Sequence, residues 1–346
     1  MCDFGRTQGI LSDDEILSAF DDVLGAVGRG VQRLHLGPGG SFFTDSEVSP
    51  VVRQGVIRRL EGLPFLRYLG IETRAPFVDE ECLERLMEDL PLGVRAVTLG
   101  FGLECVSDLP RMAAINKGYG PKQIEHALAT MRAVSQRHPD VELRFEAYVM
   151  LRPLFMTEQE AIDEALATIA WAMERDAETA VLFLNTVKPR TLQHLFHAEP
   201  DVPAELRYEP PYYRTAIEVL RRLPSEWRER TVVLGPQSAV EAVGMPRGCS
   251  LCSWPLNGAL VAHNLYRDPG LLHAAAEIAC PCRSQWESEL LVDAPPLSER
   301  IERGVEVAHR ILDAAVTPMA GAPPPSAHDP ADWRRSHAPA RDRATR

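Results

Sequence analysis

The chain has 346 residues, of which 45% are hydrophobic, so it is long enough to bury one large core or two medium ones. No stretch reaches the roughly 18 consecutive apolar residues of a transmembrane helix, and the N-terminus lacks the basic and apolar segments of a secretory signal. A formal net charge of -12 disfavours nucleic acid as a partner, although a local basic patch is compatible with an acidic average. We therefore expect a soluble cytoplasmic protein without a membrane partner.

Short apolar runs rich in β-branched residues alternate with longer segments of helical period. Helices are expected at residues 49–62, 121–138 and 157–176, and Thr157 with Glu160 has the spacing of a capping box. Repeated strand and helix units predict an α/β fold with parallel strands covered by helices, as an open doubly wound sheet or a barrel. The expected strands begin at Val31, Leu66, Arg95, Leu143, Thr179 and Thr231.

The composition changes toward the C-terminus. After Ala320 the sequence becomes rich in proline and poor in apolar residues, which is typical of a disordered tail. We expect three parts: a barrel domain over residues 1–235, a cysteine-containing region over 236–317 and a disordered tail over 318–346.

Parallel sheets of this kind place their chemistry in the loops that follow the strands. The first expected strand leads into "GPGGSFFTD", whose glycines allow a close backbone approach to a ligand or, alternatively, a tight turn. The second ends with Glu72 and Arg74, two residues apart and so on one side of an extended strand. This pair suits a ligand with a carboxylate and an amine or hydroxyl groups, and an internal salt bridge is the alternative. The third strand presents Glu104.

Several of these motifs together resemble a known family. The order "GSFFTD", "IETRAPF", "GFGLE", "INKGYG", "AYVMLRPLFMTEQEAI" and "LNTVKPRTLQHLF" is similar to the radical S-adenosylmethionine (SAM) superfamily. Within it, the sequence most resembles the Elp3-like branch that contains the radical SAM subunit of archaeosine synthase, over residues 1–222. The resemblance implies a partial parallel (β/α) barrel that binds a [4Fe–4S] cluster through a Cys-x3-Cys-x2-Cys loop after its first strand.

The resemblance places Cys2, in "MCDFGRTQG", as the third cysteine of that cluster loop. Two cluster cysteines and the first strand of the family are then missing from the sequence, although three thiolates hold such a cluster. We expect a start codon assigned too late. The alternatives are a natural truncation that gave up the cluster and became a binding protein, and a free thiol at a frayed terminus.

The family's activity defines the expected function. The resemblance implies an enzyme that uses an electron donor and the [4Fe–4S] cluster to cleave SAM to methionine and a 5′-deoxyadenosyl radical, which attacks an unidentified substrate, either a tRNA base or a small molecule. The alternative is a catalytically silent, metal-stabilised barrel that binds SAM-like ligands or a protein partner. The residues that the resemblance implies for cofactor binding are Gly39, Gly40, Ser41, Glu72, Arg74, Gly102, Glu104, Asn116 and Arg152.

Four further cysteines form a separate group near the C-terminus. Cys249 and Cys252 are followed by Cys280 and Cys282, and two close pairs of thiolates suit tetrahedral zinc or a second iron–sulfur cluster. Buried thiols or a reactive pair are the alternatives. We predict a C-terminal metal-binding extension of the barrel.

Overall fold

The computed structural model describes residues 11–28, 30–37, 39–235 and 242–316. Residues 1–304 form one compact unit and residues 305–346 form a second. The division expected at residue 235 stays a prediction. None of the helices in the described ranges is both long and apolar enough to cross a membrane.

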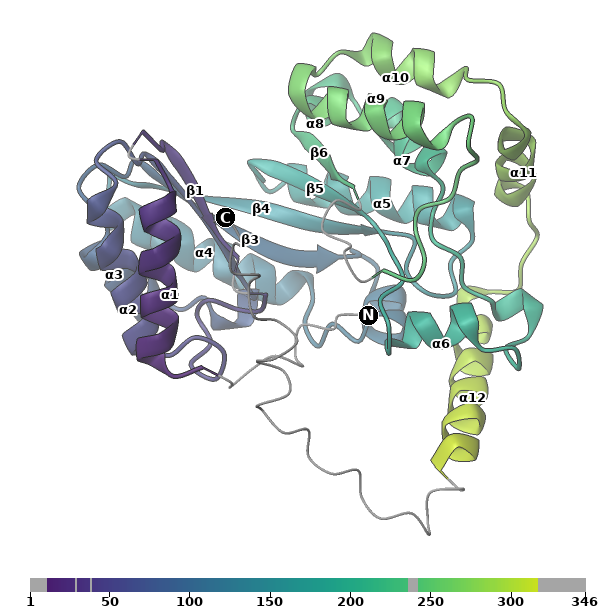
Figure 1. Ribbon diagram of the computed structural model, residues 1–346, viewed down its shortest axis with the longest axis horizontal. Coiled ribbons are helices and arrows are strands. Elements are labelled where there is room, and N and C mark those ends of the chain that lie inside the picture. The colour runs from purple at the N-terminus through teal and green to yellow at the C-terminus, as the bar shows by residue number, and fades with distance from the viewer. Residues whose placement is uncertain (1–10, 29, 38, 236–241, 317–346) are drawn as a thin grey trace, which may run out of the picture. The chain divides into compact units, whose positions relative to one another are not determined.

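A six-stranded, fully parallel sheet organises the first unit, and its strands are adjacent in the same order as in the chain. The α/β partial barrel expected from the sequence is confirmed, since the sheet forms a half-barrel with helices between its strands (Figure 1). The strands are β1 (Arg33–Leu36), β2 (Tyr68–Thr73), β3 (Ala96–Glu104), β4 (Glu142–Leu151), β5 (Thr179–Leu184) and β6 (Thr231–Leu234).

Local sequence signals explain where several helices begin. The capping box predicted at the start of the fifth helix is confirmed, because the Thr157 hydroxyl accepts the Glu160 amide while the Glu160 carboxylate accepts the Thr157 amide. Ser12 and Glu15 form a second box before the first helix. The helices are α1 (Asp13–Ala26), α2 (Pro50–Arg59), α3 (Glu80–Asp89), α4 (Pro121–Arg137), α5 (Glu158–Met173), α6 (Leu192–Ala198), α7 (Tyr213–Arg222), α8 (Ser225–Glu229), α9 (Ser253–Tyr266), α10 (Pro269–Ala276), α11 (Pro281–Leu290) and α12 (Leu297–Val316).

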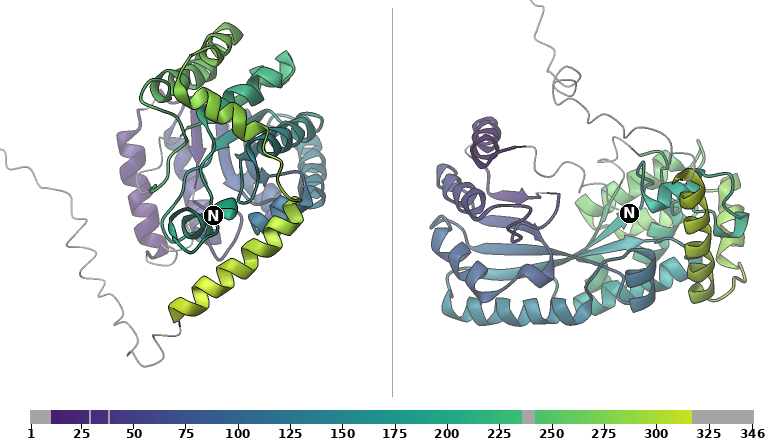
Figure 2. Two further views of the ribbon diagram at one scale, coloured as in Figure 1. Left: turned by 90° about the vertical axis from the view of Figure 1, so that its right-hand side faces the viewer. Right: turned by 90° about the horizontal axis from the view of Figure 1, so that it is seen from below.

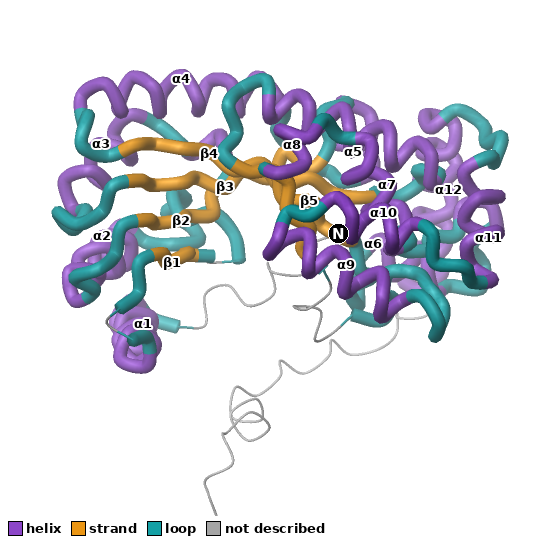
Figure 3. Tube along the Cα trace, turned by 90° about the horizontal axis from the view of Figure 1, so that it is seen from above, coloured by secondary structure: helices purple, strands orange, loops and turns teal. Residues whose placement is uncertain are grey.

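The two faces of the sheet have different chemistry. Helices α4 and α5 lie along its outer side (Figures 2 and 3), where alternate residues of the strands, such as Ile71 on β2 and Val149 on β4, are fully buried. These positions form the apolar core, with period-2 burial typical of a half-covered strand. The other face carries glycines and polar side chains, and this face holds the candidate site.

Helices α9 and α10, which follow β6 in the chain, pack within the same unit. α9 contacts β6 and α7, and α10 packs on α9 and α7 (Figure 1). His263, in α9, is fully buried and its Nε2 lies 3.1 Å from the carbonyl oxygen of Thr231, the first residue of β6. This arrangement brings the four C-terminal cysteines to the amino ends of α9 and α11.

Candidate active site and metal centre

Glycines allow polar side chains to lie flat on the inner face of the sheet. The register aligns Glu72 on β2 with Gly100 on β3 and Glu146 on β4. A Cβ atom at Gly100 would approach Cζ of the Tyr148 ring within 2.7 Å and would come closer still to its hydroxyl. Tyr148 therefore folds down over β3, and the position requires a residue without a side chain.

Glu72 lies at the centre of a small hydrogen-bonded group. One of its carboxylate oxygens, Oε1, lies 3.3 Å from Nε2 of His35 and 3.3 Å from the hydroxyl of Tyr148. The hydrogen bond to Glu72 raises the pKa of His35, against the lowering effect of burial. Burial raises the pKa of Glu146, and burial together with the Glu72 carboxylate raises the pKa of Tyr148. Each of these three pKa shifts favours the protonated form, so His35, Glu146 and Tyr148 hold their protons more firmly at the inner face.

The loop after β1 brings its predicted residues against the end of β2. Gly39 has a left-handed φ of +74°, which favours glycine, and the amide of Phe42 donates to the Glu72 carbonyl at 3.1 Å. The hydroxyl of Ser41, which is fully buried, lies 2.8 Å from that of Thr73 and accepts the amide of Arg74 at 3.1 Å. The Ser41 side chain thus anchors the loop to the end of β2.

Arg74 directly follows β2, and its guanidinium pairs with Glu47 rather than with Glu72. The same group stacks over the ring of Phe77, with 4.7 Å between Cζ and the ring centroid. Glu72 bonds to His35 and Tyr148, so each member of the predicted pair has its own partner. The side chain of Arg74 remains 42% exposed, which leaves it accessible to a ligand.

Glu104, at the end of β3, forms a buried ion pair with Lys117. Its Oε1 lies 2.8 Å from Nζ of Lys117, and both side chains are less than a fifth exposed. Burial alone would lower the pKa of Lys117, but the Glu104 carboxylate outweighs burial and raises it. A Cβ at Gly102 would collide with both groups. Asn116 is exposed at a φ of +57°, in the loop that presents Lys117.

Arg152, just after β4, is turned into the protein. Its side chain is 12% exposed, its Nε lies 3.3 Å from the carboxylate of Glu158, and its guanidinium donates to the carbonyl of Glu209. Its φ of +58° is unusual for a residue with a side chain. The predicted contact of Arg152 with a cofactor stays a prediction, and its observed contacts are internal.

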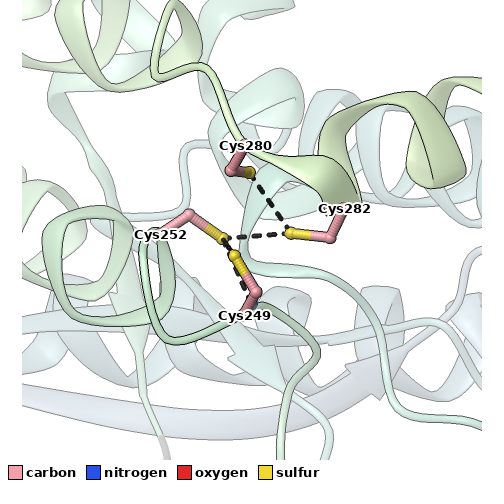
Figure 4. A group of neighbouring side chains, drawn as sticks. All are labelled: Cys249, Cys252, Cys280 and Cys282. Atoms are coloured by element: carbon pink, nitrogen blue, oxygen red, sulfur yellow. Dashed lines mark hydrogen bonds between the residues drawn. The ribbon is translucent and has the colours of Figure 1, made fainter.

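The four C-terminal cysteines point toward one another (Figure 4). Sulfur atoms are separated by 3.7 Å between Cys249 and Cys252, 3.1 Å between Cys252 and Cys282, and 3.3 Å between Cys280 and Cys282. All four sulfurs lie within 4.8 Å of one another, and none forms a disulfide. The predicted cysteine group capable of binding a metal is therefore confirmed.

A buried cation adjoins this cluster. Arg214, which is 3% exposed, donates to Sγ of Cys280 at 3.2 Å. Burial alone would raise the pKa of Cys280, but the Arg214 hydrogen bond and the neighbouring thiols outweigh it and lower the pKa to about 6. A thiolate is the form that binds a metal, so this environment favours a ligand.

The spacing of the sulfurs fits a single metal ion. Tetrahedral zinc with zinc–sulfur bonds of about 2.3 Å separates its thiolates by roughly 3.8 Å. A four-iron cluster places each thiolate on a different iron atom, so its thiolates stand farther apart than those around one ion. Four thiolate ligands, their closely spaced sulfur atoms and the adjoining Arg214 guanidinium all suit a zinc ion.

The cluster implied by the resemblance is a different case. Its assigned cysteine, Cys2, lies outside the described residues. Of the described cysteines beyond the C-terminal group, Cys82 is in α3 and Cys105 is fully buried behind β3, as expected of packed thiols. Across the described ranges, the C-terminal four are the only group of three or more metal-ligating side chains. These residues therefore do not fit a [4Fe–4S] cluster at the strand ends.

Sequence reasoning missed several residues of both sites. Glu47 lies 27 residues from its partner Arg74, Arg214 lies 66 residues from Cys280, and only the fold brings these partners together. The lysine at position 117 was visible in "INKGYG", but nothing in the motif indicated that it pairs with Glu104.

No family model matches the sequence. The chain is 27% identical over 254 residues to archaeosine synthase subunit beta of Methanosarcina acetivorans, which covers 73% of this chain and 68% of the relative. It is 23% identical over 210 residues to archaeosine synthase subunit beta of Thermococcus kodakarensis, which covers 61% of this chain and 60% of that relative. Among solved structures, the archaeal Elp3 of Methanocaldococcus infernus aligns with a TM-score of 0.45 and 12% identity, over 74% of this chain and 59% of that one.

Proposed function

We propose that the chain belongs to the Elp3-like radical SAM group, as a relative of the archaeosine synthase beta subunits to which it is similar, and that its half-barrel binds SAM at the inner face and carboxyl ends of the strands. The aligned regions span 60–68% of the curated relatives' length, so the activity of the whole protein belongs to the proposal as well.

One observation carries this proposal. The loop at Gly39 and Gly40, the carboxylate of Glu72 and the Glu104–Lys117 pair come from three separate motifs, and the fold places them along neighbouring strands β1, β2 and β3. Backbone amides, a carboxylate and a cation are the groups that recognise the amine, hydroxyls and carboxylate of a SAM-like ligand.

This chain's own residues would bind and orient the ligand. Glu72 would accept hydrogen bonds from an amine or from ribose hydroxyls, while His35 and Tyr148 fix the position of its carboxylate. In the family, a bound [4Fe–4S] cluster supplies the electron that breaks a carbon–sulfur bond of SAM. The described residues do not provide three thiolates for that cluster at the strand ends.

A second candidate function has a specific observation in its favour. The described four-cysteine group lies at the amino ends of α9 and α11 and not in the loops that follow the strands. This favours a metal-stabilised barrel that binds SAM or a similar ligand without redox chemistry. In both cases we propose that Cys249, Cys252, Cys280 and Cys282 hold one zinc ion.

The first measurement tests the SAM site that both candidates share. SAM binding is measured by calorimetric titration into the purified chain, and Glu72→Gln should weaken its affinity at least about tenfold. The control is Glu81→Gln, at an exposed glutamate of α3 that forms an ion pair with Arg85, and it should leave the affinity unchanged. Binding that Glu72→Gln leaves unchanged would contradict the assigned site.

Anaerobic reconstitution with iron and sulfide then tests the redox function. Release of 5′-deoxyadenosine that requires dithionite and is lost in Cys2→Ala would support the radical enzyme. SAM binding and one zinc per chain, with no 5′-deoxyadenosine from this chain or from one extended upstream of Met1, would support the binding protein.

A further inference from the structure

Glu158, the first residue of α5, carries one of the most deeply buried carboxylates described in the chain. It is 1% exposed, although the first turn of a helix is normally a solvated place for an acidic residue. Its oxygens accept from the guanidinium of Arg247 at 2.6 Å and from the hydroxyl of Thr215, and Arg152 lies 3.3 Å away. A buried carboxylate is tolerated only while such partners surround it.

Both cysteine-bearing segments reach this carboxylate. Arg247 stands two residues before Cys249, on the loop that carries the first cysteine pair. Trp286 belongs to α11, which begins between the second pair, and its Nε1–H donates to the hydroxyl oxygen of Thr215 at 3.0 Å. The Thr215 hydroxyl has a single proton, which it donates to Glu158, while its oxygen accepts from Trp286. Thr215 therefore links α11 to the Glu158 carboxylate through two hydrogen bonds.

On its other side, Glu158 holds the carboxyl end of β4. Arg152 pairs with Glu158 through its side chain, and its carbonyl oxygen accepts from Nδ2 of Asn185 at 3.1 Å and from the hydroxyl of Tyr208 at 3.0 Å. Asn185 directly follows β5, so these bonds tie the ends of β4 and β5 together. The left-handed backbone at Arg152 needs this surrounding support.

We propose that Glu158 is a positioning residue through which the loaded four-cysteine centre fixes the loop of residues 152–157 at the carboxyl end of β4. A metal ion that joins the two cysteine pairs holds the Arg247 loop and α11 in place together. Without the ion, the link between the two segments weakens to direct contacts such as the Arg247–Glu289 ion pair, and the carboxylate is held less firmly by the partners that make its burial tolerable. This inference rests on the proposed zinc site and is independent of SAM binding.

Hydrogen exchange measured by mass spectrometry tests the coupling on the full chain. Removal of zinc by a chelator under reducing conditions should speed amide exchange in residues 152–157 about tenfold, in line with losing one hydrogen bond to a charged group. Residues 74–79 follow β2 at the same end of the sheet, where Arg74 pairs with Glu47 of the loop after β1, so their exchange should not change.

A substitution tests the route without removing the metal. Trp286→Phe keeps an aromatic ring but loses the Nε1–H donor to Thr215, so the zinc content should stay at one per chain while exchange in 152–157 rises. Trp254→Phe, at an 83% exposed position beside Cys252, is the matched control and should change neither. Glu158→Gln should abolish the further effect of chelation where that variant folds.

Three outcomes would overturn the proposal in distinguishable ways. If the chain binds no metal, both the proposed zinc site and the proposed coupling are wrong. If zinc is released and amide exchange in residues 152–157 does not change, the proposed coupling is wrong but the zinc site is still supported. If amide exchange in residues 152–157 is equal in Trp286→Phe and Trp254→Phe, the coupling does not pass through Thr215 and Glu158.

Discussion

Replacing Gly100 with alanine tests the arrangement of the inner face directly. A Cβ there would lie 2.7 Å from Cζ of Tyr148, well inside the distance of ordinary contact, so the ring must leave the sheet. Overpacking of this kind costs about 1–3 kcal/mol, and the displaced hydroxyl also loses its contact with Glu72. We expect Gly100→Ala to lower the free energy of unfolding by about 1–3 kcal/mol and to weaken SAM binding.

The assay is urea denaturation of the single variants and of Gly100→Ala combined with Tyr148→Ala. Because the clash requires the ring, most of the penalty of Gly100→Ala should vanish in the Tyr148→Ala background. Gly62→Ala is the control, since a Cβ at Gly62 meets no atom within 4 Å. A penalty of equal size with and without the Tyr148 ring would refute the reasoning, and so would a neutral Gly100→Ala.

Three other predictions concern the metal and the charged pairs. Cys282→Ser should lose the zinc, measured by metal analysis, and lower Tm, because metal bound only by the folded state adds to stability. Lys117→Met should cost about 3–5 kcal/mol in urea denaturation, because it leaves Glu104 buried without a partner, and adding Glu104→Gln should recover most of the loss. The Glu72 contact raises the pKa of His35 above its ordinary 6.5, so its contribution is complete below pH 6.5 and is lost as the pH rises through the raised value. The difference in denaturation midpoint between wild type and His35→Asn should therefore shrink with increasing pH, and a constant difference would contradict the assignment.

The elements that sequence alone predicted are those with a strong local signal. The run around Leu143 predicted a strand that the structure extends over Glu142–Leu151, and the pattern at Thr157 predicted the start of α5. Both depend on contacts within a few residues, namely side-chain alternation in the first case and a capping box in the second. The start of β1 was expected at Val31 and lies at Arg33, a difference typical of strand ends.

The partners of the site residues could not be read in the same way. Arg74 was expected to relate to Glu72, two residues away, but the fold offers it Glu47 from the loop after β1. Glu158 looked like an ordinary acidic residue of a first helical turn, which the macrodipole favours at the surface. Its partner Arg247 lies 89 residues further along the chain, so its burial is a property of the tertiary structure.

Strand β4 connects the two sites of the chain. Tyr148, on its inner face, contacts Glu72, while Arg152, four residues later, is held by Glu158 beside the cysteine segments. A parallel strand with hydrogen-bonded neighbours on both sides does not shift one end without straining its ladder. If the metal centre fixes Arg152, it also limits the movement of Tyr148 over Gly100. Removal of the metal by a chelator should then weaken SAM binding in the wild type. The effect should be smaller in Tyr148→Ala, which lacks the side chain whose movement the metal centre limits.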